Sequence, residues 1–511
     1  MRHLLICREY PPAPGGGIGT YALVLARLLA GAGEEVHVIG QAWEGAEAPV
    51  QEECEGRLVI HRLPFMDWRA APRQRPHPAL RGRPEAGFFH TACPALAFSW
   101  GAARLAERLV DEAGIELVEA QEYEAPLYYF LRRRALGLGP RRRPPTLVHL
   151  HSPSEYIARH NGQNLDAPAL RAAKRLEDYC IAAATALLCP SRFLARRVEE
   201  ARGLPRRSIQ VIPLPMPPGE AARRPSPARA GGPVCYAGRL ERRKGVLEFI
   251  AAAVEVAGED PQVSFEFAGE NILGRSPLQS ELVLRSLVPP ELWERFRFHG
   301  PLSRGRLAAF YARARLAAVP SRWENFPYAC VEAMSAGLPV LATRSGGMPE
   351  MIRDGQTGWL AQACEKKALA QALRRALETP PEELARMGAR AAAEIEQLCG
   401  PQAVLEQQLA FRASLAAQGA PRPQPFPLPS PVFAWPGDSR ASLVRNCGAR
   451  KPALQLGLEL AQDGLALALR HPAAFFALGA ALARRLRRAL RRGAGRGSFR
   501  AANPPQGGPD G

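Results

Sequence analysis

The sequence predicts an α/β protein made of two doubly wound domains, followed by a basic C-terminal tail. Short apolar runs, typical of buried parallel strands, alternate with helical patterns of about 10–15 residues. A stretch rich in Pro, Ala and Arg at residues 216–233 interrupts this alternation, which then resumes. The length of 511 residues also suits more than one domain, since a domain averages roughly 150 residues.

The first domain, residues 1–215, opens with a strand, a turn and a helix. Residues 4–7 form a continuous apolar run, residues 20–29 have helical spacing, and residues 36–39 form the next strand. A second helical pattern covers residues 96–113. Further strands are expected at residues 58–63, 117–118, 146–151, 186–189 and 209–212. Right-handed crossovers would place them all in one parallel sheet.

The second domain, residues 234–418, follows the interdomain linker at 216–233 and repeats the same pattern. Its Ala-rich helices end near Leu415. Strands are expected at residues 234–237, 263–268, 296–299, 316–319 and 340–342. A Pro-rich linker over residues 419–436 then separates this domain from the tail.

The tail, residues 437–511, contributes half of the formal net charge of +18, with 13 basic and 4 acidic residues. Leu478, Leu482, Leu486 and Leu490 recur every four residues, and the remaining faces carry Arg484, Arg485, Arg487, Arg488, Arg491 and Arg492. This pattern predicts a basic amphipathic helix that docks on an anionic membrane surface. The alternative is a solvated or disordered basic tail. A nucleic-acid partner is not expected.

The remaining composition favours a cytoplasmic protein, peripheral at the inner face of the membrane if the tail docks there. Ten cysteines occur singly, without the C-x-x-C spacing of a zinc site or a disulfide framework. The first apolar run is too short for a secretory signal, and no run approaches the ~20 residues of a spanning helix. No resident metal or cofactor is expected.

A glycine-rich turn lies between the first strand and its helix. In Gly15-Gly16-Gly17-Ile18-Gly19, glycines allow a ligand to approach the backbone, and the free N–H groups of the helix start attract phosphate. Gly16 and Gly17 are therefore candidate phosphate contacts. The turn departs from G-x-G-x-x-G and lacks the lysine of a P-loop, so a tight turn without a ligand is the alternative.

A second candidate site follows the strand at residues 234–237. This strand ends at Gly238, and Arg239 and Lys244 come next, five residues apart. Open α/β sheets bind ligands at the carboxyl ends of their strands, and these two cations suit a diphosphate. A solvated basic turn describes Arg242 and Arg243 better than it describes Arg239 and Lys244.

A third candidate site contains two carboxylates. Glu324 lies in the loop after a strand, and Glu332 lies eight residues later in the next helix, among Ala, Cys, Val and Met. A buried carboxylate needs a partner, and ligand hydroxyls are suitable ones. A surface salt-bridge pair is the alternative. A further glycine-rich turn, residues 346–350, follows the strand at 340–342.

Together these motifs resemble the family 4 glycosyltransferases. The E-x7-E pattern of Glu324 and Glu332, the following E-A-M-x-A-G-x-P-V and the G-G-x-P-E turn are similar to the donor half of that family. Residues 9–39 resemble its acceptor half, and residues 238–245 match its G-R-x-x-x-x-K-G turn. The likeness spans about residues 1–415. It implies the GT-B fold, in which two Rossmann-like domains face each other across a cleft.

The resemblance also implies roles for the residues at the reaction centre. Arg239 and Lys244 would neutralise the nucleotide diphosphate, and the Gly16–Gly17 backbone would approach it from the other domain. His151, at a strand end, matches the active-site histidine near the sugar. His149 lies two residues earlier on the same face and is its rival.

For the rest of the donor, the resemblance assigns the third candidate site. Glu324 would bind the sugar hydroxyls, Asn325 and Phe326 would offer backbone N–H groups to sugar or phosphate, and Glu332 would hold the ribose. Pro327 departs from the family pattern, since many members have Gly there; it would stiffen the loop and alter the choice of sugar.

The expected function is therefore retaining hexosyl transfer from a nucleotide-diphosphate sugar to an acceptor hydroxyl on a glycan, a lipid-linked sugar or a small molecule. Arg239 and Lys244 could supply the leaving-group charge that a metal supplies elsewhere. One alternative is a sugar-nucleotide epimerase of the same fold, which would need a dedicated hydrolytic acid/base set. The other is a basic module that binds membrane or nucleic acid.

Overall fold

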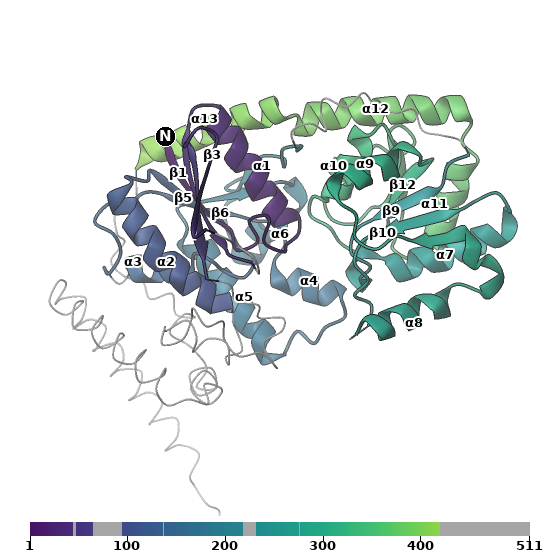
Figure 1. The fold of residues 1–511 in the computed structure, drawn as a ribbon, viewed down its shortest axis with the longest axis horizontal. Helices are drawn as coiled ribbons and strands as arrows, with labels where there is room; N and C mark the ends of the chain where they lie inside the picture. Colours follow the sequence, from purple (N-terminus) through teal and green to yellow (C-terminus); the bar gives the residue numbers. More distant parts are fainter. Residues whose placement is uncertain (44–47, 65–94, 136, 218–230, 275, 420–511) are drawn as a thin grey trace, which may run out of the picture.

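Two α/β domains lie side by side, each with a central sheet between helices (Figure 1). This computed structural model describes residues 1–43, 48–64, 95–135, 137–217, 231–274 and 276–419. The expected fold class is confirmed. The predicted amphipathic tail, and most of the two predicted linkers, lie outside the described residues. In the described part, no helix has the length and apolar character needed to cross a membrane.

The described part of the first domain contains an eight-stranded sheet in the order β3-β4-β2-β1-β5-β6-β7-β8. It is parallel except at β3, which pairs antiparallel with β4. Its strands are β1 (Arg2–Ile6), β2 (Glu35–Gln41), β3 (Val50–Glu53), β4 (Leu58–Leu63), β5 (Leu117–Gln121), β6 (Thr146–His149), β7 (Ala186–Cys189) and β8 (Gln210–Val211). Its helices are α1 (Gly17–Gly31), α2 (Ala95–Glu112), α3 (Tyr128–Ala135), α4 (Ser154–His160), α5 (Pro168–Ala183) and α6 (Arg192–Arg202).

The described part of the second domain contains a six-stranded, all-parallel sheet in the order β11-β10-β9-β12-β13-β14. Its strands are β9 (Val234–Ala237), β10 (Phe265–Ala268), β11 (Phe296–Phe298), β12 (Leu316–Val319), β13 (Val340–Thr343) and β14 (Gly358–Ala361). The α-helices that follow β9 are α7 (Val246–Glu259), α8 (Pro277–Leu287), α9 (Arg304–Ala312), α10 (Tyr328–Ser335), α11 (Lys366–Leu377), α12 (Pro381–Cys399) and α13 (Pro401–Gln418). Short 3₁₀ turns are η3 (Arg242–Lys244), η4 (Pro290–Arg295) and η5 (Met348–Glu350).

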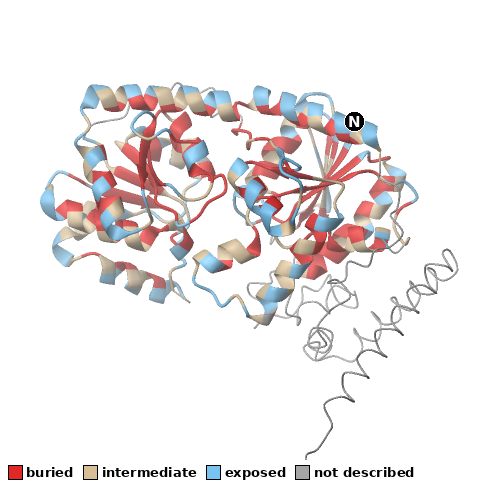
Figure 2. Cartoon of the chain, turned by 180° about the vertical axis from the view of Figure 1, so that it is seen from behind, coloured by how far each residue is buried: buried red, intermediate tan, exposed pale blue. Residues whose placement is uncertain are grey.

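The central strands are buried on both faces, as Figure 2 shows for both sheets. Every residue of β5, β6, β12 and β13 is buried, which explains the apolar sequences of β12 and β13, whereas β5 also buries Glu119 and Gln121. In the first sheet, Leu5 packs in the same cluster as α1, whereas Leu4 packs with α2 on the other face. Alternate side chains therefore enter two separate layers of core.

The sequence missed two strands, β3 and β14. Strand β3 reads Val-Gln-Glu-Glu and lies at the edge of its sheet, where its residues are half-exposed or exposed. Its sequence therefore contains no apolar run that would predict a strand. Strand β14 begins at Gly358, where a Cβ would lie 2.0 Å from the carbonyl oxygen of Val340 on the neighbouring strand, so only glycine fits there. The predicted strand at 146–151 ends earlier, at His149, so His151 lies in the turn beyond it.

Helix α13 departs from the predicted domain division. Residues 401–418 were assigned to the second domain, but α13 packs on the first sheet, where Val404 and Leu415 join a cluster with Leu117, Leu147 and Leu188 (Figure 1). Helices α12 and α13 thus run from the second domain back to the first.

A buried ion pair anchors this returning helix. The guanidinium of Arg412 contacts Glu119 of β5, and both side chains are at most 3% exposed. Glu119 also accepts a hydrogen bond from the Tyr21 hydroxyl at 3.0 Å. Burial alone would raise the pKa of Glu119, but Arg412 and His149 lower it to about 2. Glu119 is therefore ionised at neutral pH.

Replacing Arg412 by Met should destabilise the protein strongly, because it leaves the Glu119 carboxylate buried without its cation. Losing one partner of a buried pair costs about 3–5 kcal/mol of unfolding free energy. The matched control is Arg374→Met, which breaks partly exposed ion pairs with Glu255 and Glu259 on the surface and should cost about 1 kcal/mol or less. Urea denaturation at pH 7 measures both values; equal losses would contradict the anchoring role.

The same pair has a defined pH dependence. Because the pKa of Glu119 is lowered from 4.5 to about 2 in the folded state, the ionised Glu119 stabilises the folded protein fully above about pH 4.5. This stabilisation should be lost as the pH falls from there toward pH 2.

Candidate active site

The candidate residues gather where both sheets reverse their strand order. In the second sheet the strands run in the Rossmann order, with the switch point between β9 and β12. Ligands of open α/β sheets bind at the carboxyl ends of strands at such a point. Gly238 follows β9 directly, and the loop with Glu324 follows β12. In the first sheet the corresponding strands are β1, which precedes the glycine-rich turn, and β5.

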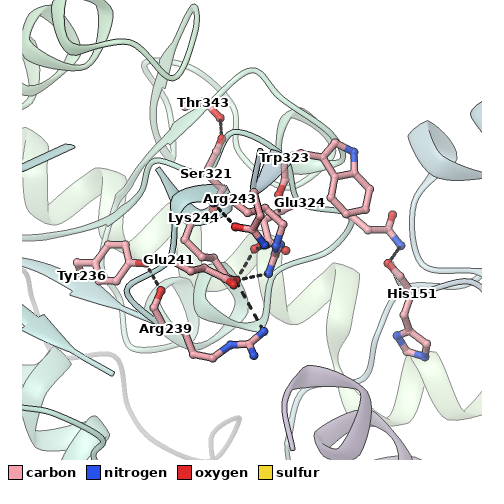
Figure 3. Close-up of polar contacts among 12 residues, drawn as sticks. His151, Tyr236, Arg239, Glu241, Arg243, Lys244, Ser321, Trp323, Glu324 and Thr343 are labelled. Carbon is pink, nitrogen blue, oxygen red and sulfur yellow. Dashed lines mark hydrogen bonds and ion pairs between the residues drawn. The ribbon is translucent and has the colours of Figure 1, made fainter. Parts of the chain in front are cut away.

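Glu324 is a buried carboxylate fixed by two cations (Figure 3). Its Oε1 lies 2.9 Å from Nη1 of Arg243 and also contacts Nζ of Lys244. Burial would raise the pKa of Glu324, but Arg243 and Lys244 lower it below its usual value. The carboxylate is therefore ionised and held in one orientation, with Oε1 occupied by cations.

The structure corrects the interpretation of Arg243 as part of a solvated turn. Arg243 is 5% exposed, and besides Glu324 it binds Glu241 at 2.8 Å and donates to the carbonyl of Trp323 at 3.3 Å. It is a site residue that the sequence analysis missed. The acidic Glu241 within the basic run was the available signal, because buried arginines need carboxylate partners.

Arg239 keeps an accessible guanidinium. Its side chain is 44% exposed, and Nη2 lies 3.7 Å from Glu241 Oε1, beyond hydrogen-bonding distance. The Tyr236 hydroxyl donates to the Arg239 carbonyl at 2.8 Å, which fixes the turn after β9. Gly238 has φ +149°, a conformation that other residues rarely adopt. Arg239 is thus held by its backbone while its charge remains available to an anion.

The glycine-rich turn is packed against Glu9. The Gly16 N–H donates to Glu9 Oε2 at 2.8 Å, and a Cβ on Gly19 would lie 2.2 Å from the Glu9 carbonyl oxygen. Tight packing therefore accounts for part of the glycine content. A Cβ on Gly17 would lie 3.5 Å from the ring of Tyr328 in α10, so the turn does adjoin the second domain. A phosphate could use the Gly16 N–H only after Glu9 releases it.

Asn325 connects the site residues of the two domains across the domain interface. Its Nδ2 donates to the carbonyls of Leu150 at 3.2 Å and of His151 at 2.8 Å. Its Oδ1 accepts from the Ser191 hydroxyl at 2.5 Å. Because Asn325 follows Glu324 directly, the donor loop and the turn that carries His151 are held in register by one side chain.

The glycine turn at residues 346–350 supports the same interface. The Gly347 N–H donates to the Glu324 carbonyl at 2.9 Å, and a Cβ on Gly346 would lie 1.8 Å from that oxygen. Glu350 accepts from the backbone N–H groups of Arg192 and Phe193, at 2.9 and 2.7 Å. An acid from the second domain thus caps helix α6 of the first, a role that the sequence analysis did not foresee.

His151 lines a small cavity in the first domain, between the ends of β1 and β5 and helix α1. The other lining residues are Leu5, Ile6, Cys7, Ile18, Tyr21, Ala22, Glu119, Ala120 and Gln121. His149 does not line it; its ring lies 4.1 Å from that of His151 and is 1% exposed. Burial and the neighbouring His149 lower the pKa of His151 well below its usual value, so its imidazole is neutral at neutral pH.

The remaining predicted residues differ in burial. The Phe326 side chain is packed in the core cluster, and Glu332 on α10 is half-buried rather than enclosed in the expected apolar layer. Within the described residues, no group of three or more His, Cys, Asp and Glu side chains is placed to hold a metal ion.

Comparison with known proteins assigns both halves of the chain. Residues 15–218 match the family model described as Glycosyltransferase Family 4, and residues 225–394 match that of Glycosyl transferases group 1. Glycogen synthase of Mycobacterium tuberculosis is 27% identical over 74% of this chain and 87% of its own length. D-inositol 3-phosphate glycosyltransferase of Streptomyces griseus is 28% identical over 74% and 80%.

Solved structures show the same fold. Sucrose-phosphate synthase from Thermosynechococcus elongatus has a TM-score of 0.62 at 20% identity, over 82% of this chain and all of that one. HepE from Anabaena, in complex with UDP-glucose, has a TM-score of 0.55 at 18% identity, over 81% of this chain and all of that one.

Proposed function

Since this chain belongs to the family 4 glycosyltransferases, we propose that it transfers a hexosyl group from a nucleotide-diphosphate sugar to an acceptor hydroxyl with retention of anomeric configuration. The observation that carries the proposal is the ionised Glu324, held by Arg243 and Lys244 at the switch point of the second sheet. The next residue binds the backbone of His151 in the other domain. Matches to transferase models in both halves favour transfer over epimerisation or simple binding.

The charges at the site suit departure of a diphosphate. Arg239 has an accessible guanidinium, and Lys244, which contacts Glu324, is partly exposed. Cations placed where charge develops stabilise the transition state more than the ground state, so these two residues could act without a metal. Glu324, being ionised, can accept hydrogen bonds from sugar hydroxyls.

Retention requires that the acceptor enters on the face that the diphosphate leaves, or that a nucleophile acts first. Glu324 is assigned to sugar hydroxyls and Glu332 to ribose, and the neutral His151 is assigned to sugar contact. We therefore propose front-face displacement: the acceptor oxygen bonds to the anomeric carbon while the sugar–phosphate bond breaks. The departing diphosphate takes the acceptor's proton.

The donor can be identified by a thermal-shift screen of nucleotide sugars. Uridine nucleotides are the first to test, since the neighbouring HepE structure contains UDP-glucose. A ligand at 100 times its dissociation constant stabilises a protein by about 2.7 kcal/mol. Transfer is then measured with the stabilising donor and a panel of glycan, lipid-linked and small-molecule acceptors. If no nucleotide sugar stabilises the protein and none supports transfer, the proposed function is refuted.

The anomeric configuration of the product tests the mechanism. An α-linked donor should yield an α-linked product, because leaving and entering groups share one face. Proton NMR of the fresh product reads the configuration of the new linkage directly. An inverted linkage, or a glycosyl adduct on Glu324 in the mass spectrum, would contradict front-face displacement.

A further inference from the structure

Two carboxylates outside the assigned site are buried behind the turn that carries His151. Glu122 directly follows β5 and is fully buried, and Glu177 of α5 is 2% exposed. In the described part of the chain neither forms an ion pair. Charged groups of this kind are almost never fully buried unless they are paired, so the contacts that hold them need explanation.

Both carboxylates bind the backbone of one short turn, residues 151–154. Glu122 accepts from the N–H of His151 at 2.7 Å and from that of Ser152 at 2.6 Å. Glu177 accepts from the N–H of Ser154 at 3.0 Å and also from the Ser154 hydroxyl. The turn is thereby tied to the end of β5 and to α5, and its last residue, Ser154, is also the first residue of helix α4.

The front of the same turn meets the donor loop. The carbonyl of His151 accepts from Asn325 Nδ2 at 2.8 Å, while its N–H points back to Glu122. One peptide segment is thus held between an acidic pair in the first domain and the residue next to Glu324 in the second. Any shift of the segment would move both the His151 ring and its link to Asn325.

The electrostatic surroundings make this support sensitive to protonation. Burial raises the pKa of Glu122 to about 7, and burial together with Glu122 raises that of Glu177 to about 8. The other titratable groups around the pair are Tyr123, Glu124 with its partner Arg8, Cys180 and Cys189. Carboxylates accept hydrogen bonds more strongly when ionised, so the turn should be held most firmly at higher pH.

We propose that Glu122 and Glu177 are positioning residues for the transfer reaction: they hold residues 151–154 so that His151 stands against the donor loop. The proposal rests on the proposed function and adds residues that act through the backbone of the turn, without touching the donor. A displacement of about 1 Å in such a site can reduce turnover roughly a hundredfold.

The test compares Glu122→Gln and Glu177→Gln with a matched control, Glu199→Gln. Glu199 is also buried in the first domain and accepts a backbone N–H, from Ile209 at 3.0 Å, but it does not contact residues 151–154. We expect kcat to fall by roughly a hundredfold in Glu122→Gln and Glu177→Gln, with the donor KM within a few-fold of wild type. Glu199→Gln should keep the wild-type kcat.

The pH profile separates positioning from a merely structural role. The wild-type kcat should rise as the pH passes from about 6 to about 8, as the pair ionises. In Glu122→Gln only Glu177 still titrates, without the raising effect of Glu122, so this rise in kcat should move to lower pH. In Glu177→Gln only Glu122 still titrates, so the rise should be smaller, and Glu199→Gln should keep the wild-type pH profile. If Glu122→Gln or Glu177→Gln does not fold, the Ser154→Ala variant tests the proposal instead. It removes a hydrogen bond that lowers the pKa of Glu177, so the rise in kcat should move to higher pH.

The possible outcomes distinguish this inference from the proposed function. A wild-type protein that transfers no sugar refutes the function. An active wild type, with kcat and pH profile unchanged in Glu122→Gln, Glu177→Gln and Ser154→Ala, overturns the inference alone.

Discussion

Glu324→Gln should reduce turnover by roughly a hundred- to a thousandfold, because it removes the fixed negative charge that we propose orients the donor sugar. The neutral amide would also leave Lys244 without its carboxylate partner, and Arg243 would keep only Glu241. Steady-state kinetics with the identified donor measure the effect. No glycosyl adduct should accumulate on the variant, since Glu324 is not assigned as a nucleophile.

A control variant separates this catalytic loss from the loss of another buried carboxylate with basic partners in the same domain. Glu266 of β10 is also buried and binds two basic side chains, His299 at 2.9 Å and Arg313. Glu266→Gln should therefore lower stability without a comparable loss of turnover. Equal losses of turnover in the two variants would mean that Glu324 acts only through folding.

Lys244→Ala and Arg239→Ala should each lower turnover roughly a hundredfold, since losing one transition-state donor typically costs about 3 kcal/mol of barrier. Turnover should fall more than donor affinity, because charge on the diphosphate grows as the glycosidic bond breaks. Lys244→Ala should also loosen Glu324, which the lysine contacts directly, whereas Arg239→Ala should leave Glu324 in place.

The control for these two variants is Arg242→Ala. Arg242 belongs to the same basic run, but its side chain is exposed. Its removal changes the net charge by the same amount and should leave turnover near the wild-type value. If Arg242→Ala matches Lys244→Ala, the general positive charge of the region accounts for the effect. Unchanged turnover in both Lys244→Ala and Arg239→Ala would show that the diphosphate lies elsewhere.

The sequence alone located the strands that organise the site. The strands at residues 316–319 and 234–237 were predicted correctly, because strands buried on both faces are continuous apolar runs, here followed by Pro320 and Gly238. Glu324, Arg239 and Lys244 could be selected because each follows such a strand end. The edge strand β3 escaped detection, since a half-exposed strand has no such run.

Only the tertiary structure shows which charged side chains are buried. Local spacing reports which positions are apolar, but whether a charge is buried depends on a partner that packing brings from elsewhere in the chain. Arg412 is fully buried because it meets Glu119, which lies 293 residues earlier in the sequence. Glu122 accepts a hydrogen bond from the N–H of His151, which lies 29 residues later, and the residues next to Glu122 in the sequence do not predict that contact. The sequence by itself therefore predicted two α/β domains and the strand ends at which the candidate site residues lie. The support behind His151, the burial of Arg243 and the return of α13 were decided by long-range packing, because an unpaired charge costs too much free energy to bury until its partner is in place.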